Sequence, residues 1–203
     1  MGKWTRRGFI TAGVVGGSAL VIGVALRPGN RNDEVAALVA QPDDTLVNIW
    51  VKIAGDNSVT VIVPHSEMGQ GAQTVLAQML ADEMDANWED VSILEAPAHD
   101  SYANYALPYG FVFGDADVPK VLVGTLKGVF LQAAKAMNMQ ITGGSLSIRA
   151  TGVFGMRVAG AAARQVLLEA ASEAWGVPVS QLRTDRGQIF TSDGRLAAPF
   201  SEF

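Results

Sequence analysis

The stretch Pro64–Thr74 reads PHSEMGQGAQT and marks a change in the pattern of the chain. The five residues before it, VTVIV, are β-branched as in a strand, whereas Ala72–Met84 after it places apolar residues at helical spacing. Gly69 and Gly71 stand between the two. Because glycine tolerates a positive φ and has no Cβ, the backbone N–H groups of such a turn can converge. A glycine turn at the start of a helix is an arrangement that binds anionic groups.

The residues around this turn predict an α+β fold, in which β-hairpins and short strands pack with helices. Residues 46–54 (LVNIWVKIA) alternate as a strand, and the turn-forming GDNS that follows predicts a hairpin with residues 59–63. VSILEA, from Val91, predicts a third strand. The later pattern predicts a loop at 100–117, helices at 118–139 and 155–175, a hairpin around Arg186 and Gly187, and the first turn of another helix at Ser201–Phe203.

A second glycine turn, ITGGSLS, precedes the helix predicted at 155–175. It contains Gly143 and Gly144, and Ser145 and Ser147 add hydroxyl groups. Two such turns in one chain favour a large anionic ligand. Spacing alone is weak support, because ligand-free turns are common in a chain with 22 glycines. The amides of Gln70 and Gln73 both donate and accept hydrogen bonds, as the edge of a pterin requires, and Glu67 is interpreted as a cap or a surface charge.

Composition excludes several kinds of chemistry. With 203 residues, 49% of them hydrophobic, the chain can bury one core of useful size or two small ones. It contains no cysteine, so it cannot itself supply disulfides, thiolate nucleophiles or iron–sulfur ligands. His65 and His99 are interpreted as turn or surface residues rather than metal ligands. Four of the 15 basic residues lie in residues 1–27, which leaves 11 against 20 acidic ones and argues against a nucleic-acid partner.

Residues 1–27 resemble a twin-arginine export signal. The adjacent Arg6 and Arg7 precede an uncharged run of 18 residues, Phe9–Leu26, which is barely long enough to cross a hydrocarbon core of about 30 Å. A cleaved signal and an uncleaved anchor both fit, with a buried core helix as the plainer alternative. We therefore expect the twin-arginine translocon as a partner and a periplasmic or periplasm-facing, membrane-associated location. Residues 28–45 predict a linker and residues 46–203 a partial ligand-binding domain.

Four segments together resemble the molybdopterin-binding large subunit of the xanthine dehydrogenase and aldehyde oxidase family, of the isoquinoline 1-oxidoreductase β-subunit type. They are EMGQGAQT (Glu67–Thr74), TGGSLSIR (Thr142–Arg149), AGAAARQVLLEAA (Ala159–Ala171) and WGVP from Trp175. The resemblance implies the N-terminal part of a molybdopterin-binding domain. Its implied activity is an oxidoreductase that hydroxylates N-heterocycles or oxidises aldehydes.

The resemblance also implies a cofactor, partners and site residues. The cofactor is molybdopterin cytosine dinucleotide with its molybdenum, [2Fe–2S] centres belong to a small partner subunit, and a cytochrome c is one candidate electron acceptor. The residues implied to face the pterin and its pyrophosphate are Gly69, Gln70, Gly71, Ala72, Gln73 and Thr74. Gly143 and Gly144 are implied to pass close to the molybdenum, with Ser145 and Ser147 on phosphate or nearby cofactor oxygens.

Two motifs of that family do not occur in this sequence. One is a glycine loop of the G-G-G-F-G type, and the other is a C-terminal Gly-x-Gly-Glu whose glutamate acts as general base; no glycine here is followed by glutamate. We therefore expect a fragment that is inactive alone. Two alternatives stay open: a non-catalytic assembly module or split subunit that needs a separately encoded remainder, and a membrane-anchored structural domain whose glycine turns bind nothing.

Overall fold

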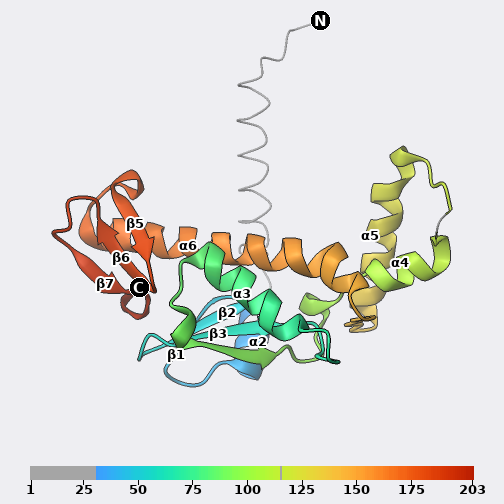
Figure 1. Ribbon diagram of the computed structural model, residues 1–203, viewed down its shortest axis with the longest axis horizontal. Coiled ribbons are helices and arrows are strands. Elements are labelled where there is room, and N and C mark those ends of the chain that lie inside the picture. Colours follow the sequence, from blue (N-terminus) through green and yellow to red (C-terminus); the bar gives the residue numbers. More distant parts are fainter. Residues whose placement is uncertain (1–30, 115) are drawn as a thin grey trace, which may run out of the picture.

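A four-stranded sheet forms the centre of the protein in the computed structural model, which describes residues 31–203 except Asp115 (Figure 1). The export signal predicted at residues 1–27 lies outside these residues. The strands are β1 (Asp44–Asn48), β2 (Val51–Ala54), β3 (Val59–Val63) and β4 (Val91–Glu95), and they lie in that order. β1, β2 and β3 pair antiparallel, whereas β3 and β4 are parallel. The α+β class expected from the sequence is confirmed.

The single strand predicted at residues 46–54 is in fact two strands. The chain turns at Ile49–Trp50, where the Asn48 side-chain oxygen accepts a hydrogen bond from the backbone N–H of Trp50 at 2.9 Å. The register of β1 against β2 also shifts between Leu46 and Asn48. Ile49 lies in this turn but is apolar because it is buried on the other face of the sheet. The apolar alternation is therefore not interrupted, and the sequence pattern alone did not reveal the turn.

Helices cover both faces of the sheet (Figure 1). On one face, α3 (Ala72–Met84) and α6 (Val153–Trp175) enclose the main core, to which Val61 and Val63 of β3 contribute. Ile62 points to the opposite face, as the period of two in a strand requires, and meets α2 (Arg31–Val39). The helix predicted at Ala72–Met84 is confirmed, and the one predicted at 155–175 begins two residues earlier.

Two sequence predictions for loops are wrong. The range 28–45, predicted as a linker, contains α2, because Val35 and Val39 lie four residues apart and are buried against the sheet. The range 100–117, predicted as a loop, contains α4 (Ala106–Phe113). Pro108 is compatible with this helix because it stands in the first turn of α4, where no intrahelical N–H is required.

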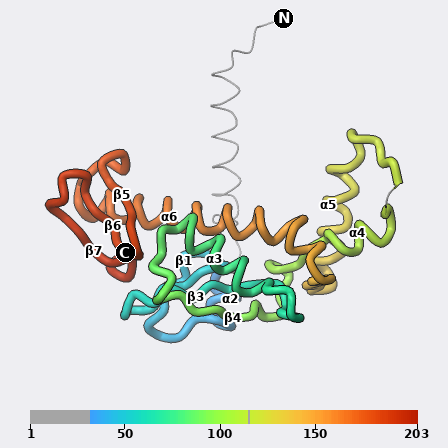
Figure 2. Tube along the Cα trace, viewed as in Figure 1, coloured from blue at the N-terminus to red at the C-terminus, as the bar shows by residue number. Residues whose placement is uncertain are grey.

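The remaining elements lie at the two ends of α6 (Figures 1 and 2). Near its beginning, α4 and α5 (Lys120–Ala136) extend away from the body, and α5 confirms the helix predicted at 118–139. Near its end lies a second sheet of β5 (Leu182–Asp185), β6 (Gln188–Thr191) and β7 (Ala197–Pro199), which confirms the predicted hairpin. In the part of the chain that the structure describes, five short helical turns complete the fold: Trp88–Asp90, Asp100–Tyr102, Ile148–Gly152 (a π-helix), Val179–Gln181 and Phe200–Glu202. Within residues 31–203, Asp115 aside, no helix has the length and apolarity of a bilayer-spanning segment.

α3 and α6 run in the same direction and in close contact (Figure 2). Leu76 of α3 lies beside Gly152, just before α6, and Leu80 lies beside Gly160 within it. Farther along, the Arg164 guanidinium is 2.8 Å from the Asp85 carboxylate at the end of α3. The two helices therefore begin at the same end of the molecule.

Gly160 sets how closely these helices approach. A Cβ at this position would overlap the Leu80 carbonyl oxygen, and it would lie 3.1 Å from the Leu80 carbonyl carbon and 3.0 Å from the Glu83 Cβ. Because two of these neighbours are backbone atoms, they cannot rotate away. A methyl group here must push α6 away from α3.

We expect Gly160→Ala to lower the free energy of unfolding by about 1–3 kcal/mol, the usual cost of overpacking a core. Gly155→Ala is the matched control, because Gly155 also lies in α6 but a Cβ at this position would meet no atom within 4 Å. That substitution should stabilise the protein by about 0.5–1 kcal/mol through helix propensity. Urea unfolding followed by circular dichroism measures both, and equal effects would contradict the close contact.

Candidate functional site

The two glycine turns lie at the same end of the molecule. Because α3 and α6 run in the same direction, Gly69 and Gly71 before α3 and Gly143 and Gly144 before α6 stand at the same ends of these helices (Figure 1). The segments that lead into the turns are hydrogen-bonded: the Ser66 backbone N–H donates to Thr142 Oγ1 at 2.8 Å. The helix dipoles therefore place their positive ends on one side of the protein.

Glu67 accepts the backbone donors of the first turn. Gly69 and Gly71 adopt φ values of 88° and 73°, which favour glycine, and both donate their N–H groups to Glu67 Oε1, at 2.8 Å and 2.9 Å. The N–H of Gln73 donates to Glu67 Oε2 at 3.3 Å. The hydrogen bond from Gly71, followed by those from Gln73 and Gly69, lowers the pKa of this exposed carboxyl. The turn thus has the geometry of an anion-binding site, and its anion is the chain's own cap, as the sequence indicated for Glu67.

The other predicted residues of the first turn divide into polar and buried positions. Gln70 folds back on its own loop: its side-chain oxygen accepts from the Met68 N–H at 2.7 Å and its amide donates to the Ser66 carbonyl at 3.1 Å. Ala72 is fully buried in the main core. Thr74 is exposed and Gln73 is half-buried. A molecule at this surface could therefore meet the backbone of Gly69 and Gly71 and the side chains of Gln73 and Thr74, but not that of Ala72.

The second turn packs beneath α4. Gly143 and Gly144 have φ values of 54° and 63°, and a Cβ at Gly143 would come within 2.7 Å of the Leu107 side chain. Gly144 has no neighbour at that position, so its backbone can be approached closely. Ser145 is exposed, whereas Ser147 is completely buried and its hydroxyl makes no hydrogen bond. The structure therefore places Ser147 beneath the surface on which Ser145 lies.

His65, which the sequence indicated to be a turn or surface residue, is 2% exposed. It follows β3 and lies beside Gly152, where a Cβ would come 3.0 Å from His65 Cε1. Burial lowers the pKa of the imidazole and so favours its neutral form; the nearby Ser147 backbone acts in the opposite direction. Neither ring nitrogen forms a regular hydrogen bond.

Asn104 is a second polar residue that the sequence did not single out. Its side chain is buried, with neither the amide nitrogen nor the oxygen hydrogen-bonded. The backbone N–H of Asn104 donates to the Met139 carbonyl at 3.1 Å, and the Gln140 amide donates to the Pro97 carbonyl at 2.6 Å. These bonds join the chain after β4 to the segment that leads into the second glycine turn. In the sequence, Asn104 lies in a polar and aromatic stretch with no periodic pattern, so no signal distinguished it.

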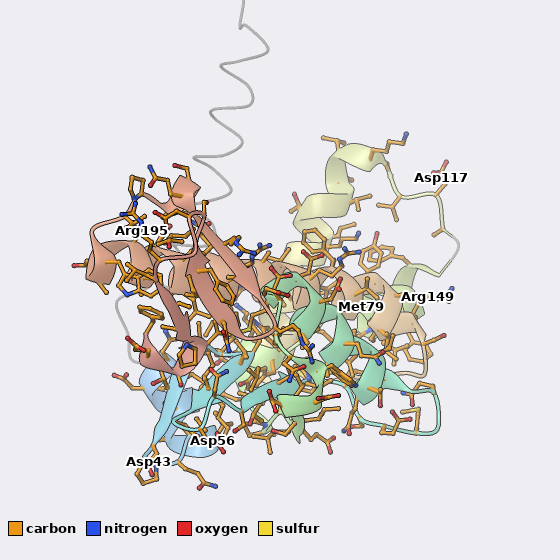
Figure 3. All side chains as sticks on the ribbon, turned by 60° about the vertical axis from the view of Figure 1, so that its left-hand side comes forward. Asp43, Asp56, Met79, Asp117, Arg149 and Arg195 are labelled. Atoms are coloured by element: carbon orange, nitrogen blue, oxygen red, sulfur yellow. The ribbon has the colours of Figure 1, made fainter. Side chains whose placement is uncertain are left out.

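Two further features concern charge. Arg149 is an exposed basic residue four residues after Ser145, and its backbone N–H donates to the Ser145 carbonyl at 3.1 Å. Figure 3 shows it on the opposite side of the molecule from Arg195. In the described part of the chain, no three or more acidic, histidine or cysteine side chains form a group that could hold a metal ion.

Known proteins with similar sequences identify the family. The family model of the molybdopterin cofactor-binding domain matches residues 4–110, more than half of the chain. This protein belongs to the molybdopterin cofactor-binding domain family. The match includes the first glycine turn of the domain and ends before the second, and it confirms the family that the sequence motifs indicated.

Two relatives of this molybdopterin cofactor-binding domain extend the comparison. The isoquinoline 1-oxidoreductase subunit beta of Brevundimonas diminuta is 29% identical over 201 residues, which cover 98% of this chain and 22% of that protein. The membrane-bound aldehyde dehydrogenase [pyrroloquinoline-quinone] of Gluconacetobacter polyoxogenes is 37% identical over 91 residues, covering 44% of this chain and 11% of that protein. The chain thus spans less than a quarter of the length of either relative.

We expect the ionisation of the Glu67 carboxylate to be detectable through the resonances of the backbone amides that it binds. Because its pKa in the folded protein lies below the usual 4.5, it stabilises the turn at pH values above about 4.5. This contribution is lost as the pH falls through the folded-state pKa. In ¹H–¹⁵N NMR spectra, the Gly69 and Gly71 amide resonances should titrate with a midpoint below 4.5, and Glu67→Gln should abolish that titration.

Asp56→Asn provides the control, since Asp56 also has a lowered pKa but accepts its hydrogen bond from the Ser58 N–H at 2.9 Å. It should remove a titration at Ser58 and leave Gly69 unchanged. If the Gly69 and Gly71 resonances did not move in the unmodified protein, the carboxylate would not occupy the turn.

Proposed function

We propose that this domain binds the molybdopterin cytosine dinucleotide form of the cofactor and contributes one part of its site in an oxidoreductase that hydroxylates N-heterocycles or oxidises aldehydes. The observation that carries the proposal is the placement of two glycine turns, far apart in sequence, before parallel helices and joined by the Ser66–Thr142 hydrogen bond. The family match independently favours a molybdopterin ligand. The substrate class comes from the resemblance and from the names of the relatives, and the nucleotide form comes from the resemblance alone.

The residues present fit such a cofactor. A Cβ added at Gly69, Gly71 or Gly144 would meet no atom within 4 Å, so a ligand can approach these backbones closely. The exposed Ser145 hydroxyl and the Arg149 guanidinium offer donors suited to phosphate oxygens. When bound, the cofactor supplies the molybdenum redox chemistry. The roles of this chain are to hold the cofactor through the open backbone at Gly144 and the donors of Ser145 and Arg149. Glu67 keeps the first turn in shape by accepting its N–H groups.

An assembly role is a second candidate, because the chain presents large apolar side chains to solvent. Phe111 of α4 is 81% exposed and Val121 of α5 is 84% exposed. Only Ala106 and Ala134 are buried within these two helices. Such a surface favours contact with another polypeptide. We propose that the domain acts together with further polypeptide, including a small [2Fe–2S] subunit, and that a cytochrome c is one electron acceptor.

We further propose export by the twin-arginine translocon to the periplasm or to the periplasmic face of the membrane. This part of the proposal rests on the basic start and the uncharged run at residues 1–27, which fall outside the described structure. No nucleic-acid partner is proposed, given the acidic balance of the rest of the chain.

The full chain, expressed in a bacterium that makes the cytosine dinucleotide cofactor, should copurify with molybdenum. Molybdenum is measured by mass spectrometry, and cytidine monophosphate is measured after its release by acid hydrolysis. The two should be present in equal molar amounts. Gly71→Val should reduce the molybdenum content by about tenfold or more, because valine strains a residue with φ of 73° and projects into the space beside the turn.

Gly194→Val provides the matched control: Gly194 also has a positive φ, 71°, and open space, but it lies in the turn between β6 and β7. Its molybdenum content per folded chain should be unchanged. Pyrroloquinoline quinone in place of molybdenum, or an equal loss in both variants, would contradict the proposal. Turnover of isoquinoline or an aldehyde by the isolated chain would contradict the expectation that it is inactive alone.

A further inference from the structure

Unpaired polar atoms are concentrated in one region of the protein. Among the described residues, five buried side-chain nitrogen and oxygen atoms lack a hydrogen bond, and all belong to His65, Asn104 and Ser147. Each residue is at most 6% exposed. A buried polar atom without a partner costs about 1–3 kcal/mol, so such atoms are rare in folded proteins and call for an explanation.

The three residues belong to segments that hydrogen bonds hold together. His65 follows β3 and Asn104 lies after β4; these strands are parallel, so both leave the sheet at its carboxyl edge. Ser147 ends the second glycine turn. The segment 139–142 is hydrogen-bonded to the chain near His65 and Asn104, through Met139 with Asn104, Gln140 with Pro97 and Thr142 with Ser66, and it continues along the chain to Ser147. We call this region the strand-edge joint. Ligands of sheets with parallel strands commonly bind at the carboxyl ends of the strands.

The chemistry of the strand-edge joint is neutral. A neutral imidazole has one donor and one acceptor, a carboxamide has two donors and an acceptor, and a hydroxyl has one donor and acceptor sites. None of the three groups carries a positive charge in these forms. They therefore complement a flat ring edge with adjacent donors and acceptors rather than a phosphate.

We propose that His65, Asn104 and Ser147 are hydrogen-bonding contacts for the pterin ring of the cofactor, a proposal that rests on the proposed function. The cofactor is then divided between two surfaces of this chain. Its neutral ring enters the strand-edge joint, and its anionic groups lie toward the exposed backbone and hydroxyls of the glycine turns.

The ring requires the strand-edge joint to open. The segment between its two parts, residues 105–138, comprises α4 and α5, in which only two alanines are buried. Few packing contacts therefore oppose a movement of this segment relative to the sheet. The hydrogen bonds that close the joint and the packing of Leu107 against the second glycine turn oppose this opening, and bonds to the ring compensate for part of the cost.

The test uses the full chain with pterin (2-amino-4-oxopteridine) as the probe, and follows ring fluorescence for binding and thermal unfolding for stability. Asn104→Leu should raise the melting temperature by about 2–4 °C, because it removes unpaired buried groups at similar volume. The same substitution should weaken pterin binding by about tenfold or more. Ser147→Ala should also raise the melting temperature and weaken pterin binding, but both effects should be smaller. Inorganic pyrophosphate should not displace the pterin.

Asn48→Leu is the matched control, since Asn48 is an asparagine with both of its groups paired: it donates to the Ala159 carbonyl at 3.0 Å and accepts from the Trp50 N–H. It should lower the melting temperature and leave pterin affinity per folded chain unchanged. A lower melting temperature for Asn104→Leu would overturn the proposal, as would unchanged pterin affinity in Asn104→Leu and Ser147→Ala. If the unmodified chain binds neither pterin nor molybdenum cofactor, the proposed function itself fails.

Discussion

The contact between α3 and α6 at Gly160 is the constraint on which the arrangement of this protein depends. The absence of a side chain there lets α6 lie against the Leu80 carbonyl, and small residues at Ala159 and Ala163 extend the close approach. Because the helices run in the same direction, this contact also decides where they begin. Two glycine turns separated by some 70 residues of sequence are thereby held at one end of the molecule, and the Ser66–Thr142 hydrogen bond then joins the segments that lead into them. A local steric requirement in the helix thus determines the geometry of the site.

The two turns differ in how their polar groups are satisfied, and the difference follows from burial. The first turn lies at the surface, where water can solvate a charge, and a carboxylate of the chain itself binds its N–H donors. An anionic ligand at those donors has to compete with Glu67. In the strand-edge joint, by contrast, no charged group compensates for His65, Asn104 or Ser147, and their side-chain polar atoms form no regular hydrogen bond. The surface turn thus holds a charged group, whereas the strand-edge joint holds neutral polar groups, and the proposed cofactor likewise has an anionic part and a ring part.

The sequence predicted those elements whose signal is local. Helix α3 was predicted with its observed bounds because a glycine turn precedes it and one apolar stripe runs along it, and the positive φ of all four turn glycines agrees with the residue type. The errors arose where burial is decided by distant residues. Ile49 continues the apolar alternation of β1 but is buried against α2, which concealed a turn. The apolar patch that includes Val35 and Val39 is short, so the sequence alone did not indicate a helix; the helix is stabilised by the sheet that covers these two residues. His65 was interpreted as a turn or surface residue; it does follow β3 in a bend, but nothing in PHSEMGQG shows that Gly152, 87 positions later, leaves room for its ring in the interior.

For the candidate site, the sequence predicted the positions of the two glycine turns, whereas only the structure shows which side chains near them are exposed and which are buried. Ala72 and Ser147 belong to the motifs and are buried, so membership of a motif does not establish contact with a ligand. Conversely, Asn104 belongs to no pattern that was recognised, yet it is attached through Met139 to the segment that leads into the second turn. The physical reason is that a motif fixes backbone conformation, which is local, while the pairing of a polar side chain depends on every element packed around it. In this domain the unpaired side chains of His65, Asn104 and Ser147 therefore add to the proposed ligand contacts two residues, His65 and Asn104, that the glycine motifs did not indicate.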